Sequence, residues 1–398
     1  MRTLAISFTN FGPYHLARLR ALAHALEDLG TRLIAYETAG TEGRYPWMTE
    51  RHDEPFLWRT LFPNTRLEDL SARQCRTAIT QVLNEDQPDV VAIVGYARPE
   101  SHRALKWAER RGCARILLSE SQEIDHPRVW WREAVKRQRV LRYTSALVGG
   151  PRHRDYLVKL GMPAHQISMG YNAVDNDRYV MLAKLCRQAG RDAYPVPARP
   201  YFLSVQRFVP EKNGLLLIRA YEHYRQTCGA NDPWDLVLCG AGPSEPEIRQ
   251  RILSSPYVSS IHLPGFLQDH DLAAFYTFAS ALVHPSLMEP WGLVVNEAAA
   301  CAVPLLISNR AGCVQTFVPQ PNWITGCQFD PTDIGELTAC LTRMAGCSES
   351  ERRVMGQRAT EVVAQWGPDR FAQGLIQAWH LSEDSAMVTT RKAARVNT

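Results

Sequence analysis

The sequence predicts an α/β protein built from two doubly wound, parallel-sheet domains of the Rossmann-like kind. Short apolar runs alternate with amphipathic helical segments through both halves of the chain, as in repeated strand–helix–strand units. The chain has 398 residues, which is too long for one hydrophobic core and sufficient for two domains of ordinary size. Glycine and proline interrupt the pattern between residues 188 and 200. We therefore expect an N-terminal domain over residues 1–190 and a second domain over residues 191–365.

The N-terminal half opens with a strand over residues 4–8, followed by a tight connection at 9–13 and an amphipathic helix that ends at Gly30. Residues 90–94 and 115–118 are two further candidate parallel strands. Polar residues follow these strands, at the edge where doubly wound sheets bind ligands. They are Tyr96, His102, Glu120 and Asp125. We expect Tyr96 and Glu120 to contact an acceptor; the alternative is a loop whose residues serve as turn and cap formers.

The second half repeats the strand–loop–helix pattern. A strand over residues 202–205 leads into a loop that carries Arg207 and Lys212, and an apolar-periodic helix follows from Leu215 to Tyr224. Fixed cations in such a loop are suited to a diphosphate. The next strand, 236–239, ends in the glycine turn Gly240-Ala241-Gly242.

Two carboxylates flank the start of a later helix. Residues 281–284 form a short buried strand, and Pro290 is suited to the first helical position. The backbone amides of Gly292, Leu293 and Val294 would then bind phosphate at the helix N-terminus. Glu289 and Glu297 lie roughly 12 Å apart along the axis at about 1.5 Å per residue, whereas a hydrolytic pair needs roughly 5 to 9.5 Å. This spacing favours a clamp on a long anionic ligand; the alternative is a dipole-facing Glu and a solvated Glu.

These motifs, in this order and over some 110 residues, resemble those of family-four retaining glycosyltransferases of the GT-B fold (glycosyl transferases group 1). The R-x4-K element is Arg207 and Lys212, the glycine turn is Gly240 to Gly242, and the E-x7-E motif is Glu289 and Glu297. The resemblance implies two domains facing a central cleft and transfer of a hexose from a UDP- or GDP-sugar to a hydroxyl acceptor, with retention at the anomeric carbon.

The resemblance also implies roles for individual residues. Arg207 and Lys212 would neutralise the leaving diphosphate, Glu289 would bind the hydroxyls of the donor sugar, and Glu297 would hold the ribose. The amides of Gly292, Leu293 and Val294 would bind the phosphates, and the glycine turn at Gly240 and Gly242 also belongs to the donor site. No metal or other cofactor is implied. Residues 366–382 resemble the family's closing helix, which returns to the first domain, and we expect residues 383–398 to be a frayed tail.

The first loop also resembles the family's glycine loop, although Gly12 is followed by Pro13 where relatives often carry a second glycine. Gly12 would then approach the donor phosphates. His15, in the first turn of the following helix, is a candidate acceptor-side base or donor contact. A helix-capping or merely exposed histidine is the alternative interpretation.

Composition excludes several classes of protein. With 22% charged and 45% hydrophobic residues the chain is not disordered as a whole. No segment approaches the roughly 18 apolar residues of a membrane span, and the first residues are too polar for a signal peptide. The ten cysteines form no C-x-x-C pair, so we expect buried reduced thiols and a cytoplasmic location. We expect no nucleic-acid partner.

Positive charge is concentrated in residues 128–142, which include Trp130, Trp131 and six Lys or Arg residues against one Glu. A basic helix with paired tryptophans is suited to an anionic lipid surface. We therefore include peripheral contact with the inner membrane face among the possible partners. The alternative is an amphipathic helix with a solvated basic face.

Two further motifs are better explained without a ligand. Asp175-Asn176-Asp177 has the D-x-D form that binds metal in another glycosyltransferase fold, yet turn chemistry explains it. Gly240-Ala241-Gly242 lacks the third glycine of a dinucleotide fingerprint, because position 245 is Glu. We therefore expect neither a metal ion nor NAD.

The functional hypothesis is a hexosyltransferase acting on a hydroxyl of a glycan, a lipid-linked sugar or a small metabolite in polysaccharide or glycoconjugate biosynthesis. Among enzymes, the alternative is a GT-B phosphorylase or an inverting sugar-nucleotide enzyme. From another class, the alternative is a non-catalytic sugar-nucleotide sensor or scaffold that retains the pocket.

Overall fold

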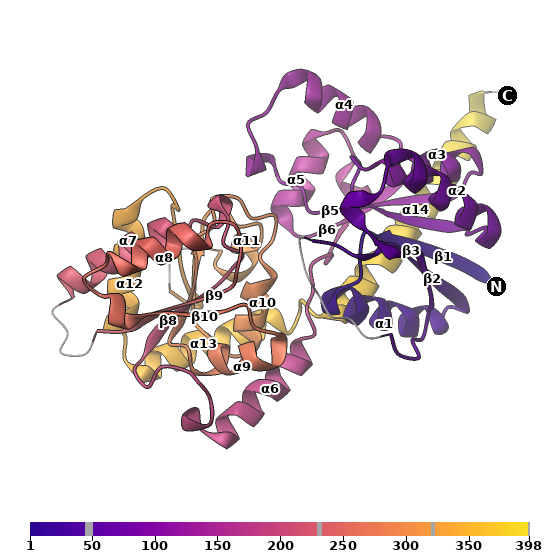
Figure 1. The fold of residues 1–398 in the computed structure, drawn as a ribbon. Helices are drawn as coiled ribbons and strands as arrows, with labels where there is room; N and C mark the ends of the chain where they lie inside the picture. The colour runs from indigo at the N-terminus through magenta and orange to yellow at the C-terminus, as the bar shows by residue number, and fades with distance from the viewer. Residues whose placement is uncertain (44–50, 229–232, 320–322, 397–398) are drawn as a thin grey trace. The chain divides into compact units, whose positions relative to one another are not determined.

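The computed structural model describes residues 1–43, 51–228, 233–319 and 323–396, and the chain divides into two compact units (Figure 1). The N-terminal unit combines Met1–Asp175 with Trp366–Thr398. The C-terminal unit is Asn176–Gln365. Each unit has its own parallel sheet.

The N-terminal unit is built on a parallel sheet of seven strands in the order β3-β2-β1-β4-β5-β6-β7. Its strands are β1 Arg2–Phe8, β2 Thr31–Thr41, β3 Leu57–Arg66, β4 Val90–Val94, β5 Ala114–Ser119, β6 Ser145–Val148 and β7 Ile167–Met169. Its helices are α1 Pro13–Glu27, α2 Ala72–Asp86, α3 Pro99–Arg110, α4 Trp130–Val140, α5 Pro151–Lys159 and α14 Pro368–Val396. The chain order reverses between β1 and β4, which is where such sheets open for ligands.

Two apolar cores cover the two faces of this sheet. On one face, Leu19 and Leu22 of α1 and Phe371 and Leu375 of α14 pack against the strands. On the other face, α2, α3 and α5 supply the buried side chains. The strands are apolar on both faces, as expected for parallel strands covered by helices on both sides.

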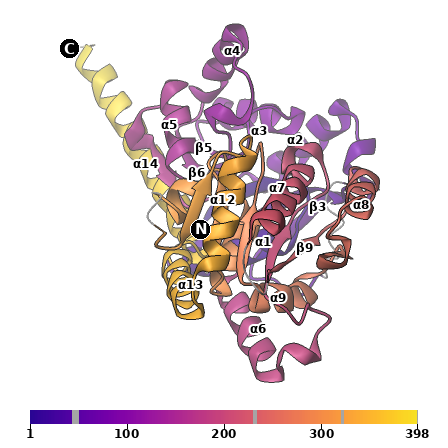
Figure 2. The same cartoon turned by 90° about the vertical axis from the view of Figure 1, so that its left-hand side faces the viewer.

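The C-terminal unit repeats this design with six parallel strands in the order β10-β9-β8-β11-β12-β13. Its strands are β8 Tyr201–Val205, β9 Asp235–Cys239, β10 Ile261–Gly265, β11 Ala281–His284, β12 Leu305–Ser308 and β13 Gly326–Phe329. Its helices are α6 Asn176–Ala189, α7 Gly214–Thr227, α8 Glu245–Leu253, α9 Asp269–Phe278, α10 Leu293–Ala300, α11 Val314–Phe317, α12 Ile334–Gly346 and α13 Glu349–Val363. Helices α7, α8 and α12 lie on one face of the sheet (Figure 2).

The border between the units differs from the predicted one at 190/191. Helix α6 belongs to the C-terminal unit, because it packs against α9 and α10. Asn176 Nδ2 donates to the carbonyl of Val363 (2.7 Å), and Arg187 donates to the carbonyl of Cys301 (2.8 Å). The glycine and prolines after residue 189 end the helix but do not separate the two cores.

Helix α14 returns to the N-terminal unit, and it continues beyond the segment predicted for it. Ser168 donates to the carbonyl of Gly374 (2.7 Å), and Ala378 and Trp379 lie in the same core as α1. The prediction of a frayed tail over 383–398 is wrong as far as Val396, because the helix runs on to that residue. This segment contains alanine, methionine, lysine and arginine and no glycine or proline, a composition that favours helix. Residues 397–398 lie outside the described part.

Two of the ten cysteines are brought together by the fold of the C-terminal unit. Cys327 of β13 and Cys340 of α12 are joined as a disulfide, whereas we predicted ten reduced thiols. These two elements pack against each other and bring both residues to one apolar interface, and their spacing along the chain gives no hint of this.

Among the residues that the structure describes, no helix is both long and apolar enough to cross a membrane.

The packing of α14 yields a prediction about stability. Leu375 is fully buried between α14 and the sheet, so Leu375→Ala should destabilise the N-terminal unit by about 2–5 kcal/mol through lost burial and a cavity. Val158→Ala, at a 41% exposed position of α5, should change stability by less than about 0.5 kcal/mol. Thermal denaturation followed by circular dichroism compares the two; equal melting temperatures would mean that α14 does not hold this unit together.

Candidate functional site

Two loops meet at the carboxyl edge of the second sheet, where the strand order reverses between β8 and β11. One loop, residues 206–213, follows β8 and carries Arg207 and Lys212; the other, residues 285–292, follows β11. The Leu287 amide donates to the Glu211 carbonyl (2.8 Å), which ties the loops together. The sheet thus places the two predicted charge-bearing segments side by side.

Glu289 is the centre of this arrangement. Its carboxyl oxygen Oε2 forms an ion pair with Lys212 Nζ and accepts hydrogen bonds from His284 Nε2 (2.8 Å) and Ser286 Oγ (3.5 Å). The side chain is buried, which by itself opposes ionisation. The Lys212 ammonium and the His284 hydrogen bond outweigh burial and hold the pKa of the Glu289 carboxyl well below its usual range. Glu289 is therefore a carboxylate at neutral pH.

The predicted helix start at Pro290 is wrong, because α10 begins at Leu293. Gly292 is its N-cap residue with a φ of 102°, a conformation that favours glycine. The first intrahelical bond runs from the Val295 amide to the Gly292 carbonyl (2.9 Å). The amides of Leu293 and Val294 precede it, at the end of the helix where amides have no acceptor within the helix. The three predicted phosphate-binding positions therefore do form a helix N-terminus.

The glycine turn after β9 packs closely against the loop that carries Arg207. A Cβ atom at Gly240 would lie 1.8 Å from the Gln206 carbonyl oxygen, and one at Gly242 would lie 2.5 Å from the Phe208 carbonyl oxygen. The Phe208 amide donates to the carbonyl of Ala241 (2.8 Å). Contact of Gly240 and Gly242 with a donor stays a prediction, and close packing of the two loops accounts for both glycines.

Glu297 lies inside the C-terminal unit rather than on a solvated face. It is 1% exposed, and its Oε2 accepts a hydrogen bond from the Tyr276 hydroxyl of α9 (2.6 Å). The alternative interpretation of an exposed Glu297 is therefore wrong. Its contact with a ribose stays a prediction.

Gly12 and His15 form a cap at the start of α1. Gly12 is the N-cap residue, and its amide donates to His15 Nδ1 (3.1 Å). Because Nδ1 accepts this bond, the proton of the neutral ring is on Nε2. Burial, together with the nearby Arg18 guanidinium, holds the pKa of His15 well below its usual range. The ring can donate from Nε2, but it is unsuited to the predicted role of base; the capping alternative describes what the structure shows.

The same cap occurs at α5. Gly150 and His153 repeat the Gly-Pro-x-His pattern of Gly12 and His15, and the Gly150 amide donates to His153 Nδ1 (3.0 Å). The loop before α1 is further fixed by Glu37 of β2, whose Oε1 accepts from the Phe11 amide (2.7 Å). Both helices thus begin at the carboxyl edge of the first sheet from a fixed backbone.

Tyr96 and Glu120 lie at neighbouring strand ends of the N-terminal unit, as predicted. Burial raises the pKa of the Tyr96 hydroxyl, and a hydrogen bond with Ser121 partly offsets this. Glu120 accepts a hydrogen bond from Asn172 Nδ2. His102 Nε2 contacts the Tyr96 carbonyl (2.7 Å), so it supports the turn. An acceptor contact for Tyr96 and Glu120 stays a prediction.

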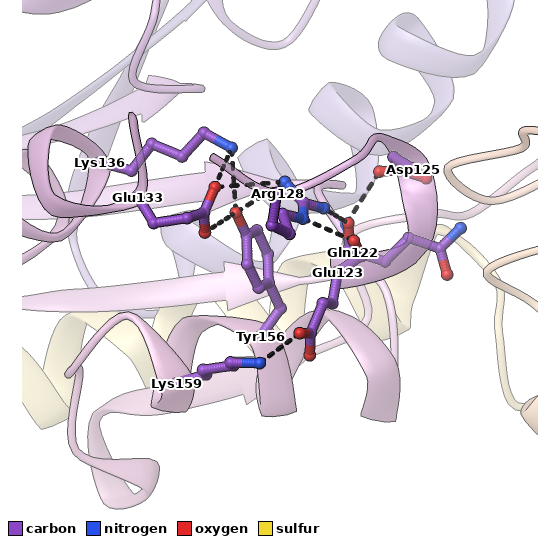
Figure 3. Close-up of polar contacts among 8 residues, drawn as sticks. All are labelled: Gln122, Glu123, Asp125, Arg128, Glu133, Lys136, Tyr156 and Lys159. Carbon is purple, nitrogen blue, oxygen red and sulfur yellow. Dashed lines mark hydrogen bonds and ion pairs between the residues drawn. The ribbon is translucent and has the colours of Figure 1, made fainter. Parts of the chain in front are cut away.

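Helix α4 carries the basic tryptophan segment, and a polar network anchors it to α5. The Tyr156 hydroxyl accepts from Arg128 (2.9 Å) and Lys136 (3.0 Å) and donates to Glu133 (2.7 Å) (Figure 3). Trp130 and Trp131 are 83% and 51% exposed. Arg128 and Lys136 are therefore engaged within this network, whereas both indole rings lie on the surface.

Sequence reasoning missed the residues that complete the charge cluster. His284 and Ser286 hold Glu289, and Tyr276 holds Glu297. A signal was present for His284, since a histidine closes an otherwise apolar strand at its carboxyl end. Tyr276 gave no signal, because its partner lies on another helix. Within the described ranges, no cluster of three His, Cys, Asp or Glu side chains has the geometry of a metal site, and Asp175 and Asp177 form none.

The sequence of the C-terminal unit matches a known protein family. Residues 191–362 match the family model of glycosyl transferases group 1. The O-antigen chain mannosyltransferase B of Escherichia coli is 26% identical over 189 residues, which are 47% of this chain and 48% of that protein. The chain thus spans about half the length of this curated relative.

Solved structures match nearly the whole chain. Sucrose-phosphate synthase from Thermosynechococcus elongatus superimposes with a TM-score of 0.70 at 18% identity, over 96% of this chain and 98% of that one. Anabaena HepE in complex with UDP gives a TM-score of 0.68 at 16% identity, over 95% and 99%. These matches confirm the predicted fold, two Rossmann-like parallel-sheet domains of the GT-B type, and the family model confirms the resemblance over the C-terminal unit.

The lowered pKa of Glu289 predicts a dependence of stability on pH. A carboxyl with a lower pKa in the folded state adds stability above its unfolded pKa of about 4.3 and loses that stability as pH falls through the folded value. The urea midpoint of the wild type should therefore fall more steeply than that of Glu289→Gln below about pH 4.3. Parallel midpoint curves for the two proteins would contradict the lowered pKa.

Proposed function

We propose that this chain, with its GT-B fold and its match to glycosyl transferases group 1, is a retaining glycosyltransferase. It transfers a hexose from a UDP- or GDP-linked donor to a hydroxyl of a glycan, a lipid-linked sugar or a small metabolite. The observation that carries this proposal is the ion pair between Lys212 and the buried Glu289 beside the N-terminus of α10. One end of this cluster is suited to a diphosphate and the other to sugar hydroxyls.

The leaving group determines what the cationic end must do. A nucleoside diphosphate departs with additional negative charge on its terminal phosphate. Lys212 and Arg207 supply positive charge from one loop, and the amides of Leu293 and Val294 supply hydrogen-bond donors and the positive end of the helix dipole. Side chains and backbone therefore meet the charge that a metal ion meets in other transferases, and the proposed reaction uses no metal or other cofactor.

The anionic end orients the sugar. Glu289 is ionised and accepts hydrogen bonds, and sugar hydroxyls are good donors to a carboxylate. Orientation of the anomeric carbon against the acceptor lowers the entropic part of the barrier. Glu297 would bind the ribose through the carboxyl group that now contacts Tyr276.

Retention follows from a front-face reaction, in which the departing phosphate oxygen accepts the proton of the acceptor hydroxyl. This proposal needs no protein base, and the geometry of His15 agrees with that, since its Nδ1 is engaged by Gly12. An inverting enzyme needs a base opposite the leaving group, and a phosphorylase uses inorganic phosphate. Product analysis separates the three: release of UDP or GDP with a retained anomeric configuration supports the proposal, and either other outcome opposes it.

A second part of the proposal concerns where the protein acts. Trp131 and Val135 of α4 are exposed and lie four residues apart on one helix face, and Arg132 and Arg137 are exposed beside them. Such a helix binds at an anionic lipid surface with its aromatic rings at the headgroup level. We propose peripheral contact with the cytoplasmic membrane face through α4, which would bring the enzyme to a lipid-linked acceptor.

The site assignment predicts a loss of activity. A screen of UDP-, GDP- and ADP-sugars first identifies the donor by its effect on the melting temperature. With that donor, Lys212→Ala and Glu289→Ala should each lower kcat/KM by a factor on the order of 10² or more. Lys159→Ala, which breaks an exposed ion pair with Glu123, serves as the matched control and should keep wild-type activity. Near-normal rates in both site variants would refute the assignment, and nucleotide binding without transfer would favour a sensor.

The membrane contact predicts co-sedimentation with lipid. The wild type should bind vesicles that contain phosphatidylglycerol, and a Trp130→Ser/Trp131→Ser variant should bind at least about 10-fold less, because two interfacial aromatic rings are lost. Leu253→Ser, at a 76% exposed position of α8, controls for loss of any exposed apolar side chain. A wild type that stays in the supernatant with anionic vesicles would remove the lipid hypothesis.

A further inference from the structure

We propose that His284 is a positioning residue that holds the Glu289 carboxylate in place when Lys212 turns toward the diphosphate of the donor. The ion pair between Lys212 and Glu289 is then a latch that donor binding opens. This inference rests on the proposed function, because it takes the diphosphate site as given. It adds a role for a residue that does not itself touch the substrate.

The latch follows from two demands on one ammonium group. Lys212 Nζ is paired with Glu289 Oε2, and the proposed reaction needs the same ammonium group at the diphosphate. Glu289 is 7% exposed, so water does little to stabilise its charge when the ammonium moves away. A buried carboxylate that loses its cation is strongly destabilised unless another group hydrogen-bonds to it.

His284 is placed to be that group. Its Nε2 lies 2.8 Å from Glu289 Oε2, the same oxygen that Lys212 contacts. The residue ends β11 and is paired in register with Ile307 of β12, and it is 1% exposed. Lys212 is 20% exposed and reaches the carboxylate through a flexible four-carbon stem. Of these two partners of Glu289, His284 is therefore fixed by the sheet, and Lys212 is free to move.

The remaining nitrogen of the ring supports this assignment. His284 Nδ1 is buried, and within the described part of the chain it has no hydrogen-bond partner. A buried unpaired nitrogen costs stability, and an apolar ring of similar size would avoid that cost. Packing alone therefore does not explain a histidine here. The Nε2–H bond to Glu289 does.

The space for this bond comes from Gly292. A Cβ atom there would lie 3.2 Å from His284 Nε2 and 3.4 Å from Glu289 Cγ, closer to the imidazole than most side-chain contacts. The bond between His284 and Glu289 consequently lies directly against the first turn of α10. A diphosphate at that helix N-terminus would therefore lie near both Lys212 and Glu289.

The test measures binding of inorganic pyrophosphate and of UDP by titration calorimetry. His284→Phe keeps the ring volume and removes the donor, so Lys212 stays committed to Glu289 and pyrophosphate should bind on the order of 10-fold more weakly. His284→Gln places an amide N–H near the position of Nε2 and should restore most of the affinity. His262→Phe is the matched control, because His262 makes a similar bond to Asp235 (2.9 Å) at the end of the sheet away from β11; its affinity should equal that of the wild type.

A double-mutant cycle shows whether His284 acts through Glu289. In a Glu289→Gln background there is no carboxylate to latch, so adding His284→Phe should leave the affinity for pyrophosphate unchanged. An equal loss in both backgrounds would mean a general structural effect and would overturn the proposal. Should His284→Phe fail to fold, His284→Asn, whose shorter amide does not reach Glu289, replaces it beside His284→Gln.

The outcomes separate the latch from the proposed function. A wild type that binds neither pyrophosphate nor UDP overturns the diphosphate site and the latch with it. A wild type that binds both, together with a His284→Phe variant of unchanged affinity, overturns the latch alone and leaves the glycosyltransferase assignment standing.

Discussion

The loops of the C-terminal unit converge on one buried carboxylate, that of Glu289, which Lys212, His284 and Ser286 contact. Glu289 lies at a point where β8, β11 and α10 all end or begin, and each element supplies part of its surroundings. Lys212 comes from the loop after β8, and His284 from the end of β11. A parallel doubly wound sheet is what makes this possible, because neighbouring strands deliver their loops to one edge. The proposed chemistry requires that the Glu289 carboxylate is buried and ionised, with ion-pair and hydrogen-bond partners that stabilise its charge.

Glycines set the distances in this arrangement. Gly240 and Gly242 let the turn after β9 lie against the loop of Arg207, and Gly292 leaves room for the imidazole beside the carboxylate. In the N-terminal unit, the buried acid Glu37 and the ring of His15 fix the loop before α1 by accepting hydrogen bonds from its backbone amides. Both units thus use short-range packing and backbone hydrogen bonds to fix loops that, in most proteins, are the mobile part.

Much of the fold could be predicted from the sequence, because buried parallel strands are nearly continuous apolar runs. The predicted strands at 90–94 and 281–284 coincide with β4 and β11. Contacts between residues that lie far apart in the chain could not be predicted in the same way. Lys212 and Glu289 were each expected at the donor, but nothing in their spacing along the chain shows that they pair with each other. The start of α10 was placed three residues early, because Pro290 suits a first helical turn and Gly292 overrides it as N-cap. Helix α6 was assigned to the wrong unit, because a break in periodicity marks the end of a helix and not the border of a core.

The return of α14 to the first sheet has a consequence for biogenesis. Phe371 and Leu375 of α14 cover one face of the first sheet, so this face stays open until α14 has been synthesised, although most of that unit is synthesised before the second unit. The second unit is continuous in sequence and has its own core, so it can mature earlier than the unit that precedes it. During translation the nascent chain therefore carries an apolar surface that stays exposed until α14 packs against it.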